Sequence, residues 1–175
     1  MRISEFDRDI ATKIRQRSGY DNEFFLKSFA PRENHQQMTK FQIGSGKSDS
    51  FFFYTANRQF IIKTLKEDEL KLLTKQGILD RYYKHIKKNP NSLLSRFYGI
   101  YTVKIKFMKP ISVVIMDNLM SQEISTIEAI YDLKGSLHRR DTKQIKSSKT
   151  VRKDLNFLRD TNNVIKLAPE VKEDF

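Results

Sequence analysis

Two adjacent apolar segments joined by a turn constrain the fold of this chain more than any other feature. Phe51–Tyr54 and Phe60–Ile62 are rich in aromatic and β-branched residues, and the segment Thr55–Arg58 between them is typical of a turn. The sequence therefore predicts an antiparallel hairpin. Its second strand ends at Lys63 and carries that lysine to the interior, although a lysine at a strand end more often faces solvent.

A second pair of strands is predicted further along the chain. Apolar and polar residues alternate from Tyr101 to Phe107, which indicates a half-buried strand. Lys109-Pro110 then turns the chain into another strand, Ile111 to Met116. This apolar run is far shorter than a transmembrane helix, so we expect any membrane contact to be peripheral.

Helical spacing of apolar residues predicts helices before and between these strands. Ile10 to Ile14 and Phe24 to Phe29 indicate two short helices, with Asp21 or Asn22 as the N-cap of the second. Leu70 to Ile86 indicates a longer amphipathic region, broken near Gly77 and stopped at Asn89-Pro90.

The charge balance predicts an anionic partner. The chain has 175 residues, with 33 Lys and Arg against 21 Asp and Glu, a formal net charge of +12. Such a surplus suits nucleic acid, a phosphorylated ligand or an acidic membrane surface. There is no cysteine, which excludes disulfides and thiol-based sites and fits a reducing compartment.

The segment Tyr131-Asp132-Leu133-Lys134-Gly135-Ser136 carries the clearest catalytic pattern. Lys134 could hold an anionic phosphoryl group while Asp132 orients or deprotonates an attacking hydroxyl. The charged pair by itself more often belongs to an ordinary surface turn, because charged turns are common.

A second candidate site is the Ser- and Gly-rich segment Phe41–Ser50, which precedes the predicted hairpin. Small residues let backbone N–H groups approach a phosphate, although the segment could also be a loop without a ligand. No Gly-Lys-Ser/Thr opens a helix here, so it is not a Walker motif. The acidic residues Glu67–Glu69 suit the start of a helix, where they face its positive end.

Taken together, these segments resemble the phosphatidylinositol phosphate kinases. The hexapeptide resembles the family's Asp-Leu-Lys-Gly-Ser signature, and Asn91–Tyr101 and Asp154–Leu158 resemble two further family segments in the same order. The likeness runs from about Ile10 to Leu158. The chain departs from the family pattern at four positions, which are Asp49, Asp117, Leu137 and Asn156.

The resemblance implies a role for each candidate residue. Asp132 and Lys134 would be catalytic. Lys63 would neutralise nucleotide phosphates and pair with Glu69. The residues expected to bind the nucleotide are Gly44, Ser45, Gly46, Lys47, Ser48, Ser50, Lys63, Glu69, Asp117, Asn118 and Leu119. Those expected to face lipid or membrane are Arg139, Arg140, Lys143 and Lys146. No metal ligand is expected within the chain, because no acidic residue after Ser136 follows an apolar strand.

The implied fold is α+β, an antiparallel sheet with flanking helices that is distantly similar to protein kinases. Residues 1–118 would be an amino-terminal lobe and residues 119–175 the start of a carboxy-terminal lobe, so the kinase domain would be truncated. The implied reaction is ATP- and Mg²⁺-dependent phosphorylation of a phosphatidylinositol phosphate. Overall likeness to the family's 5-kinases favours conversion of the 4-phosphate to the 4,5-bisphosphate. These 175 residues alone are expected to be inactive.

Two alternatives to this interpretation stay open from the sequence. The chain could be a basic, non-catalytic module that binds anionic membrane or nucleic acid, or a truncated pseudokinase of the same family. Under the kinase interpretation, the expected partners are a phosphoinositide substrate, an anionic membrane surface and a second copy in a homodimer, and no nucleic acid. The expected location is cytoplasmic, peripheral at the cytoplasmic face of membranes, above all the plasma membrane.

Overall fold

The computed structural model describes residues 1–38, 42–43, 50–120, 127–162 and 164. The chain forms two compact units, Met1–Ser121 and Gln122–Phe175, and each has a sheet of its own. None of the helices within the described ranges is both long enough and apolar enough to span a bilayer.

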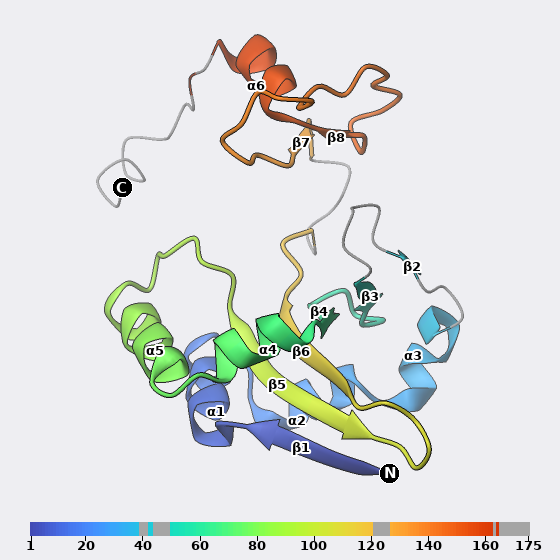
Figure 1. Cartoon of the computed structure of the whole chain (residues 1–175), viewed down its shortest axis with the longest axis vertical. Helices are drawn as coiled ribbons and strands as arrows, with labels where there is room; N and C mark the ends of the chain where they lie inside the picture. Colours follow the sequence, from blue (N-terminus) through green and yellow to red (C-terminus); the bar gives the residue numbers. More distant parts are fainter. Residues whose placement is uncertain (39–41, 44–49, 121–126, 163, 165–175) are drawn as a thin grey trace. The chain divides into compact units, whose positions relative to one another are not determined.

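The first unit is built on a six-stranded sheet in which every neighbouring pair is antiparallel (Figure 1). Across the sheet the strands are β1 (Arg2–Phe6), β5 (Phe97–Lys104), β6 (Ile111–Asp117), β4 (Phe60–Leu65), β3 (Phe51–Tyr54) and β2 (Gln42–Ile43). The hairpin expected around Thr55–Arg58 is β3–β4, with Phe53 opposite Ile62. The sequence pattern predicts no strand at residues 2–6, which form the edge strand β1 and pair with β5.

Helices complete the described part of this unit. They are α1 (Arg8–Arg17), α2 (Asn22–Ser28), α3 (Pro31–Met38), α4 (Glu67–Thr74) and α5 (Ile78–Lys88). Asp21 is the N-cap of α2, because its carboxylate accepts a 2.7 Å hydrogen bond from the Phe24 N–H. Gly77 separates α4 from α5 with a φ of 79°. These observations confirm the expected helices, whereas α3 was not expected. Pro31 was expected only to end the helix before it, but it is the first residue of α3, because proline is tolerated in the first turn of a helix.

The core lies between the helices and the sheet and is centred on Phe60, which is fully buried. Ile14 of α1, Phe25 of α2, and Tyr98 and Ile115 of the sheet pack around it. The rings of Phe25 and Tyr98 meet Phe60 edge-on, with centroids 5.3 and 5.4 Å away. This geometry adds to the stabilisation that burial alone gives. The first unit therefore combines helices with an antiparallel sheet, as an α+β fold requires.

Strand β5 starts and ends earlier than the sequence pattern predicts. It runs from Phe97 to Lys104, so the predicted strand Tyr101–Phe107 is wrong at its carboxy-terminal end. The Met108 N–H donates to the Ile105 carbonyl at 3.1 Å and closes a turn there. Ile105 and Phe107 continue the alternation in the sequence, but they belong to this turn and are 42% and 94% exposed. Strand β4, by contrast, continues two residues past the end predicted at Lys63.

Gly99 lies beneath the ring of Tyr101, two residues further along β5. A Cβ atom on Gly99 would be 2.5 Å from the Tyr101 Cε2 atom. The ring cannot easily move away, because its hydroxyl donates a 2.8 Å hydrogen bond to Glu5 of β1. Gly99→Ala is therefore expected to lower the free energy of unfolding of the full chain by about 1–3 kcal/mol, as for overpacked sites. Denaturant unfolding would measure this change.

The same substitution made in a Tyr101→Ala background gives the matched control. Removing the ring removes the three atoms that lie nearest to the added methyl group, so most of the penalty should disappear. Equal penalties in the two backgrounds would contradict the steric explanation.

The second unit contains the short parallel strands β7 (Ile130–Tyr131) and β8 (Val151–Arg152), followed by helix α6 (Asp154–Thr161). The Asp132 N–H donates to the Arg152 carbonyl at 2.9 Å and extends the pairing by one bond. The chain between the two strands therefore leaves the sheet directly at the catalytic motif predicted from the sequence.

Candidate active site

Lys63 lies in β4, and the structure pairs it with Glu69 in the first turn of α4. Their Nζ and Oε1 atoms are 2.7 Å apart. The second carboxylate oxygen of Glu69 accepts the Lys66 backbone N–H at 2.8 Å, which fixes the carboxylate at the helix start. Hydrogen bonds from Lys63 and then from the Lys66 backbone lower the pKa of Glu69. The Lys63 side chain is 22% exposed, so its ammonium is held in one place and still reachable by a phosphate.

The other described residues predicted to bind nucleotide in this unit lie next to the ends of strands. Ser50 is buried at the start of β3. The remaining members of the Ser/Gly loop, Gly44–Ser48, lie outside the described residues. The backbone N–H of Phe51 donates to the Thr64 hydroxyl at 2.9 Å, and this bond fixes the end of the loop against β4.

Asp117 and Asn118, at the end of β6, have protein partners for their side chains. Asp117 accepts hydrogen bonds from the Tyr98 hydroxyl and the Arg96 N–H, and burial together with Asp117 raises the pKa of Tyr98. Asn118 donates to the Arg58 carbonyl at 2.6 Å. These bonds fix the segment that leaves the sheet, whereas the Leu119 side chain is 75% exposed.

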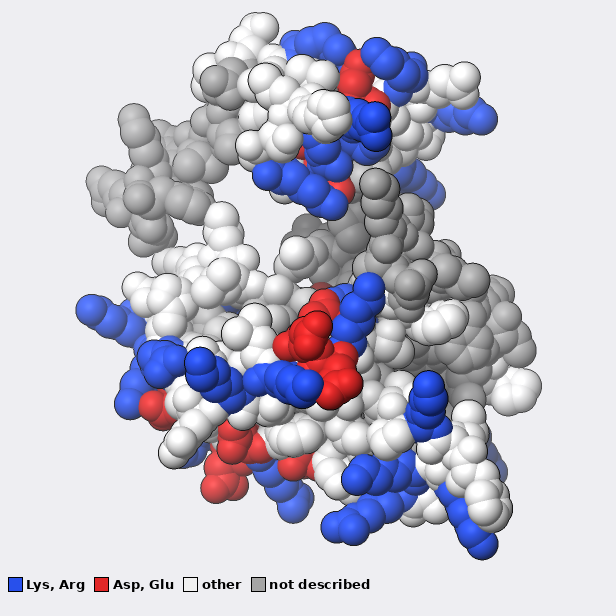
Figure 2. Space-filling model, viewed as in Figure 1, with Lys and Arg blue, Asp and Glu red and all other residues white. Residues whose placement is uncertain are grey.

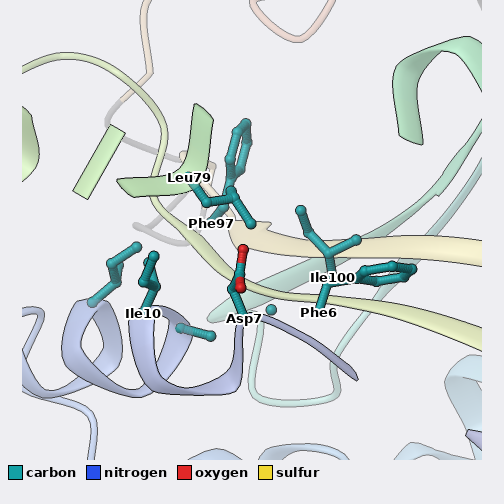
Figure 3. A pocket seen from close by; sticks show the side chains of 9 residues that line it. Phe6, Asp7, Ile10, Leu79, Phe97 and Ile100 are labelled. Atoms are coloured by element: carbon teal, nitrogen blue, oxygen red, sulfur yellow. The ribbon is translucent and has the colours of Figure 1, made fainter. Parts of the chain in front are cut away.

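An apolar depression in the first unit offers no comparable chemistry (Figure 3). It lies where α1 and α5 meet β1 and β5, and Asp7 is the polar side chain in a lining that is otherwise apolar or glycine. Phosphate binding needs cations or N–H donors, so this depression is part of the helix–sheet packing and not a nucleotide site.

In the second unit, the predicted catalytic motif forms a turn that holds a carboxylate beside an ammonium. The Asp132 Oδ2 and Lys134 Nζ atoms are 3.4 Å apart, and the side chains are 46% and 62% exposed. Gly135 has a φ of 64°, a conformation that costs glycine nothing and other residues about 1 kcal/mol or more. The two charged groups therefore stand together at the surface, open to a substrate.

The turn is held by Asp154, the first residue of α6. Its Oδ1 atom accepts the backbone N–H groups of Lys134 and Gly135, both at 2.9 Å, and that of Ser136 at 3.4 Å. Its Oδ2 atom accepts the Arg140 Nε–H at 2.7 Å. The Asp154 side chain is 9% exposed, and its bond from Arg140, with those from the backbone, holds its pKa well below the usual range. One buried carboxylate thus organises the backbone that carries Asp132 and Lys134.

Arg140, expected to face lipid, is part of this support. Its guanidinium lies between Asp154 and Asp132, also donates to the Asp132 carbonyl, and is 12% exposed. Arg139, Lys143 and Lys146 are exposed, although Lys143 pairs with Asp141 at 2.8 Å. Lys and Arg side chains are numerous on the visible face of the second unit (Figure 2).

Asn156 stands where the family pattern has an acid, and the structure shows what the amide does there. It is 1% exposed, and its Oδ1 atom accepts the N–H groups of Thr142 and Lys153. Its Nδ2 atom donates to Asp141 at 3.0 Å. A carboxylate could accept the two N–H groups but could not donate to Asp141, so the amide suits this neighbour.

Asp154 and the supporting role of Arg140 were missed by the reasoning from sequence. The sequence showed Asp154 only as the first residue of the segment Asp154–Leu158 that resembles the family, and helix α6 was not expected there. Nothing in the spacing indicates that it contacts a turn about 20 residues earlier. Among the described residues, no group of three or more His, Asp or Glu is placed to hold a metal ion.

Comparisons with known proteins identify the family to which the chain is similar. The sequence model of the phosphatidylinositol-4-phosphate 5-kinase family matches residues 33–175. A probable phosphatidylinositol phosphate kinase of Dictyostelium discoideum is 43% identical over 132 residues, which cover 74% of this chain and 18% of the relative.

Two further relatives are named as phosphatidylinositol 4-phosphate 5-kinases. That of Schizosaccharomyces pombe is 41% identical over 117 residues, covering 65% of this chain and 15% of the relative. The type-1 alpha enzyme of Rattus norvegicus is 40% identical over 118 residues, covering 66% of this chain and 21% of the relative. The chain thus spans about a fifth or less of the length of these relatives. The family match covers most of the chain, and the chain belongs to the phosphatidylinositol-4-phosphate 5-kinase family.

Proposed function

We propose that this protein takes part in the ATP-dependent phosphorylation of a phosphatidylinositol phosphate headgroup, with the 4-phosphate as substrate and the 4,5-bisphosphate as product. The observation that carries the proposal is the turn held by Asp154, which presents Asp132 and Lys134 side by side at the surface. A carboxylate next to a cation is what transfer of a phosphoryl group to a hydroxyl requires.

Under this proposal, residues of the first unit would bind the nucleotide and residues of the second unit would act on the lipid substrate. Lys63, held by Glu69, would bind the nucleotide phosphates, and the Ser/Gly loop with residues 117–119 would complete the nucleotide site. Asp132 would accept the proton of the inositol hydroxyl as its oxygen attacks the γ-phosphorus. Lys134 would balance the charge on the phosphoryl oxygens while ADP leaves. Mg²⁺ would neutralise phosphate charge, but the described residues contain no group of three or more His, Asp or Glu that could hold it, so no metal ligand is assigned in them. On this assignment the first unit is the nucleotide lobe and the second begins the substrate lobe.

Asp132→Asn in the full-length protein is expected to lower kcat by about 100-fold or more, because an amide cannot accept the hydroxyl proton. Transfer of labelled phosphate from ATP to vesicles that contain phosphatidylinositol 4-phosphate would measure it. Asp68→Asn, which makes the same change at an exposed residue of α4, should leave the rate unchanged. If the Asp132 variant keeps a rate within about threefold of the unmodified protein, well under 1 kcal/mol, Asp132 is not the base.

A second candidate function is a non-catalytic module that binds anionic membrane. The net charge of +12 and the exposed Arg139, Lys143 and Lys146 favour it. Such a module would bind anionic vesicles without turning over ATP, so the transfer assay separates the two functions. Either function would place the protein peripherally at the cytoplasmic face of a membrane. A homodimer would add a second copy of the same basic surface.

A further inference from the structure

The turn between β5 and β6 exposes apolar side chains at the end of a hairpin. In this turn Phe107 is 94% exposed, Met108 58% and Ile105 42%. Scattered exposed apolar residues are ordinary, but three within four consecutive residues at the end of a hairpin form a patch. We call residues 104–109 the hairpin tip.

Phe107 also has a backbone conformation that does not suit it. Its φ is 66°, in the left-handed region that glycine and asparagine adopt readily and bulky residues rarely do. The exposed ring makes no core contact that would offset this strain. The Lys106 ammonium lies 4.9 Å from the ring centroid, which keeps a cation next to the aromatic surface. Strained backbone conformations of this kind occur mainly at functional sites, so this one points to contact between Phe107 and a binding partner.

The charges around the hairpin tip are of one sign. Lys104, Lys106 and Lys109 belong to it, and residues 97–116 contain no Asp or Glu. Arg2 of β1 lies directly opposite Lys104, and like charges facing each other across strands are unfavourable. Around the turn between β5 and β6, the visible face of the molecule shows basic side chains without acidic ones (Figure 2). An anionic partner would remove this repulsion.

The apolar surface continues behind the tip on one face of the sheet. Ile3, Val103 and Ile111 lie opposite one another on β1, β5 and β6. Ile3 is 56% exposed and Ile111 is 44% exposed. Together with the tip, this row gives an apolar surface edged by lysines, the arrangement found in elements that lie in a membrane interface.

We infer that the hairpin tip docks on an anionic lipid bilayer, with Phe107 and Met108 inserted at the level of the headgroups and the three lysines bound to lipid phosphates. Long lysine side chains can keep their charge among the headgroups while the apolar groups are buried. This docking surface does not depend on the proposed kinase function. It lies in the first unit, away in sequence from the basic residues 139–146.

Phe107→Trp and Phe107→Asn test the insertion. The chain has no tryptophan, so Phe107→Trp creates its single tryptophan at the proposed depth, and selective excitation separates this residue from the seven tyrosines. With vesicles of phosphatidylcholine and phosphatidylserine, its emission should move to shorter wavelength and be quenched by brominated lipid. Phe107→Asn suits the left-handed conformation, so thermal stability should be kept or raised while vesicle affinity falls at least about tenfold. Leu93→Asn, a matched change at a side chain that is 76% exposed, should leave the affinity unchanged.

The charge requirement is tested by changing Lys104, Lys106 and Lys109 together to Gln. Affinity for the anionic vesicles should fall about a hundredfold, and the same change at the exposed Lys75, Lys87 and Lys88 should have a much smaller effect. All binding is measured by flotation without ATP, so an inactive kinase leaves the test valid.

Three results would overturn the proposal. They are no emission shift of the Phe107→Trp variant on vesicle binding, unchanged affinity of Phe107→Asn, or equal binding to neutral vesicles. Binding of soluble heparin without insertion into vesicles would likewise overturn it and assign the tip to a soluble polyanion.

Discussion

Lys63→Met in the full-length protein is expected to lower kcat/KM for ATP-dependent lipid phosphorylation by about 100- to 1000-fold. The reason is that a charge held ready for the nucleotide phosphates is lost, and removal of such a group typically has an effect of this size. The fold should survive, because Glu69 keeps its hydrogen bond to the Lys66 N–H and still fixes the start of α4. Partly exposed pairs of this kind contribute about 1 kcal/mol or less to stability. Steady-state kinetics with varied ATP, together with a thermal melt, would show both effects.

Lys71→Met is the matched control for this prediction. Lys71 forms an ion pair with Glu67 at 2.7 Å on the same helix, but its side chain is 68% exposed. It should change neither kcat nor KM. If Lys63→Met retains activity close to that of the unmodified protein, the pair with Glu69 is only structural and the nucleotide must bind elsewhere.

Asp154→Ala is expected to lower kcat by about 100-fold or more while KM for ATP changes little. The substitution removes the acceptor of three backbone N–H groups and leaves Arg140 beside Asp132 without its main partner. A displacement of about 1 Å of Asp132 and Lys134 would be enough for such a loss. The nucleotide lysine belongs to the other unit, so nucleotide binding should persist. Asp154→Asn, which can still accept the N–H groups through its amide oxygen, should lose less activity.

A purely structural role for Asp154 would give a different pattern. Asp141→Ala is the control, because Asp141 binds Arg159, Lys143 and Asn156 in the same unit and does not touch the turn. Both variants should melt earlier, but only the Asp154 variants should lose kcat when assayed well below their melting temperatures. Full recovery of Asp154→Ala on cooling would show that Asp154 supports stability alone and does not position the catalytic pair.

The sequence by itself determined several local elements and the family. The capping of α2 by Asp21 and the break at Gly77 depend on residues within one helical turn, so composition and spacing were sufficient. The β3–β4 hairpin follows from its turn for the same reason. The pairing of Lys63 with Glu69 was expected from the resemblance, and the structure forms it across six residues.

Only the tertiary structure decided which residues support the candidate site. Asp154 reaches the turn 18 to 20 residues earlier, and no periodic pattern reports such a contact. Arg140 appears in the sequence as one of many basic residues. Its burial against two carboxylates separates it from the exposed Arg139. The alternation beyond Lys104 predicts a longer strand, but a strand ends where its backbone partners end, and here the chain turns back to form β6. Spacing along the chain indicates which face of a helix or strand a side chain occupies. Which residues pack against that face depends on how distant segments of the chain fold back onto it.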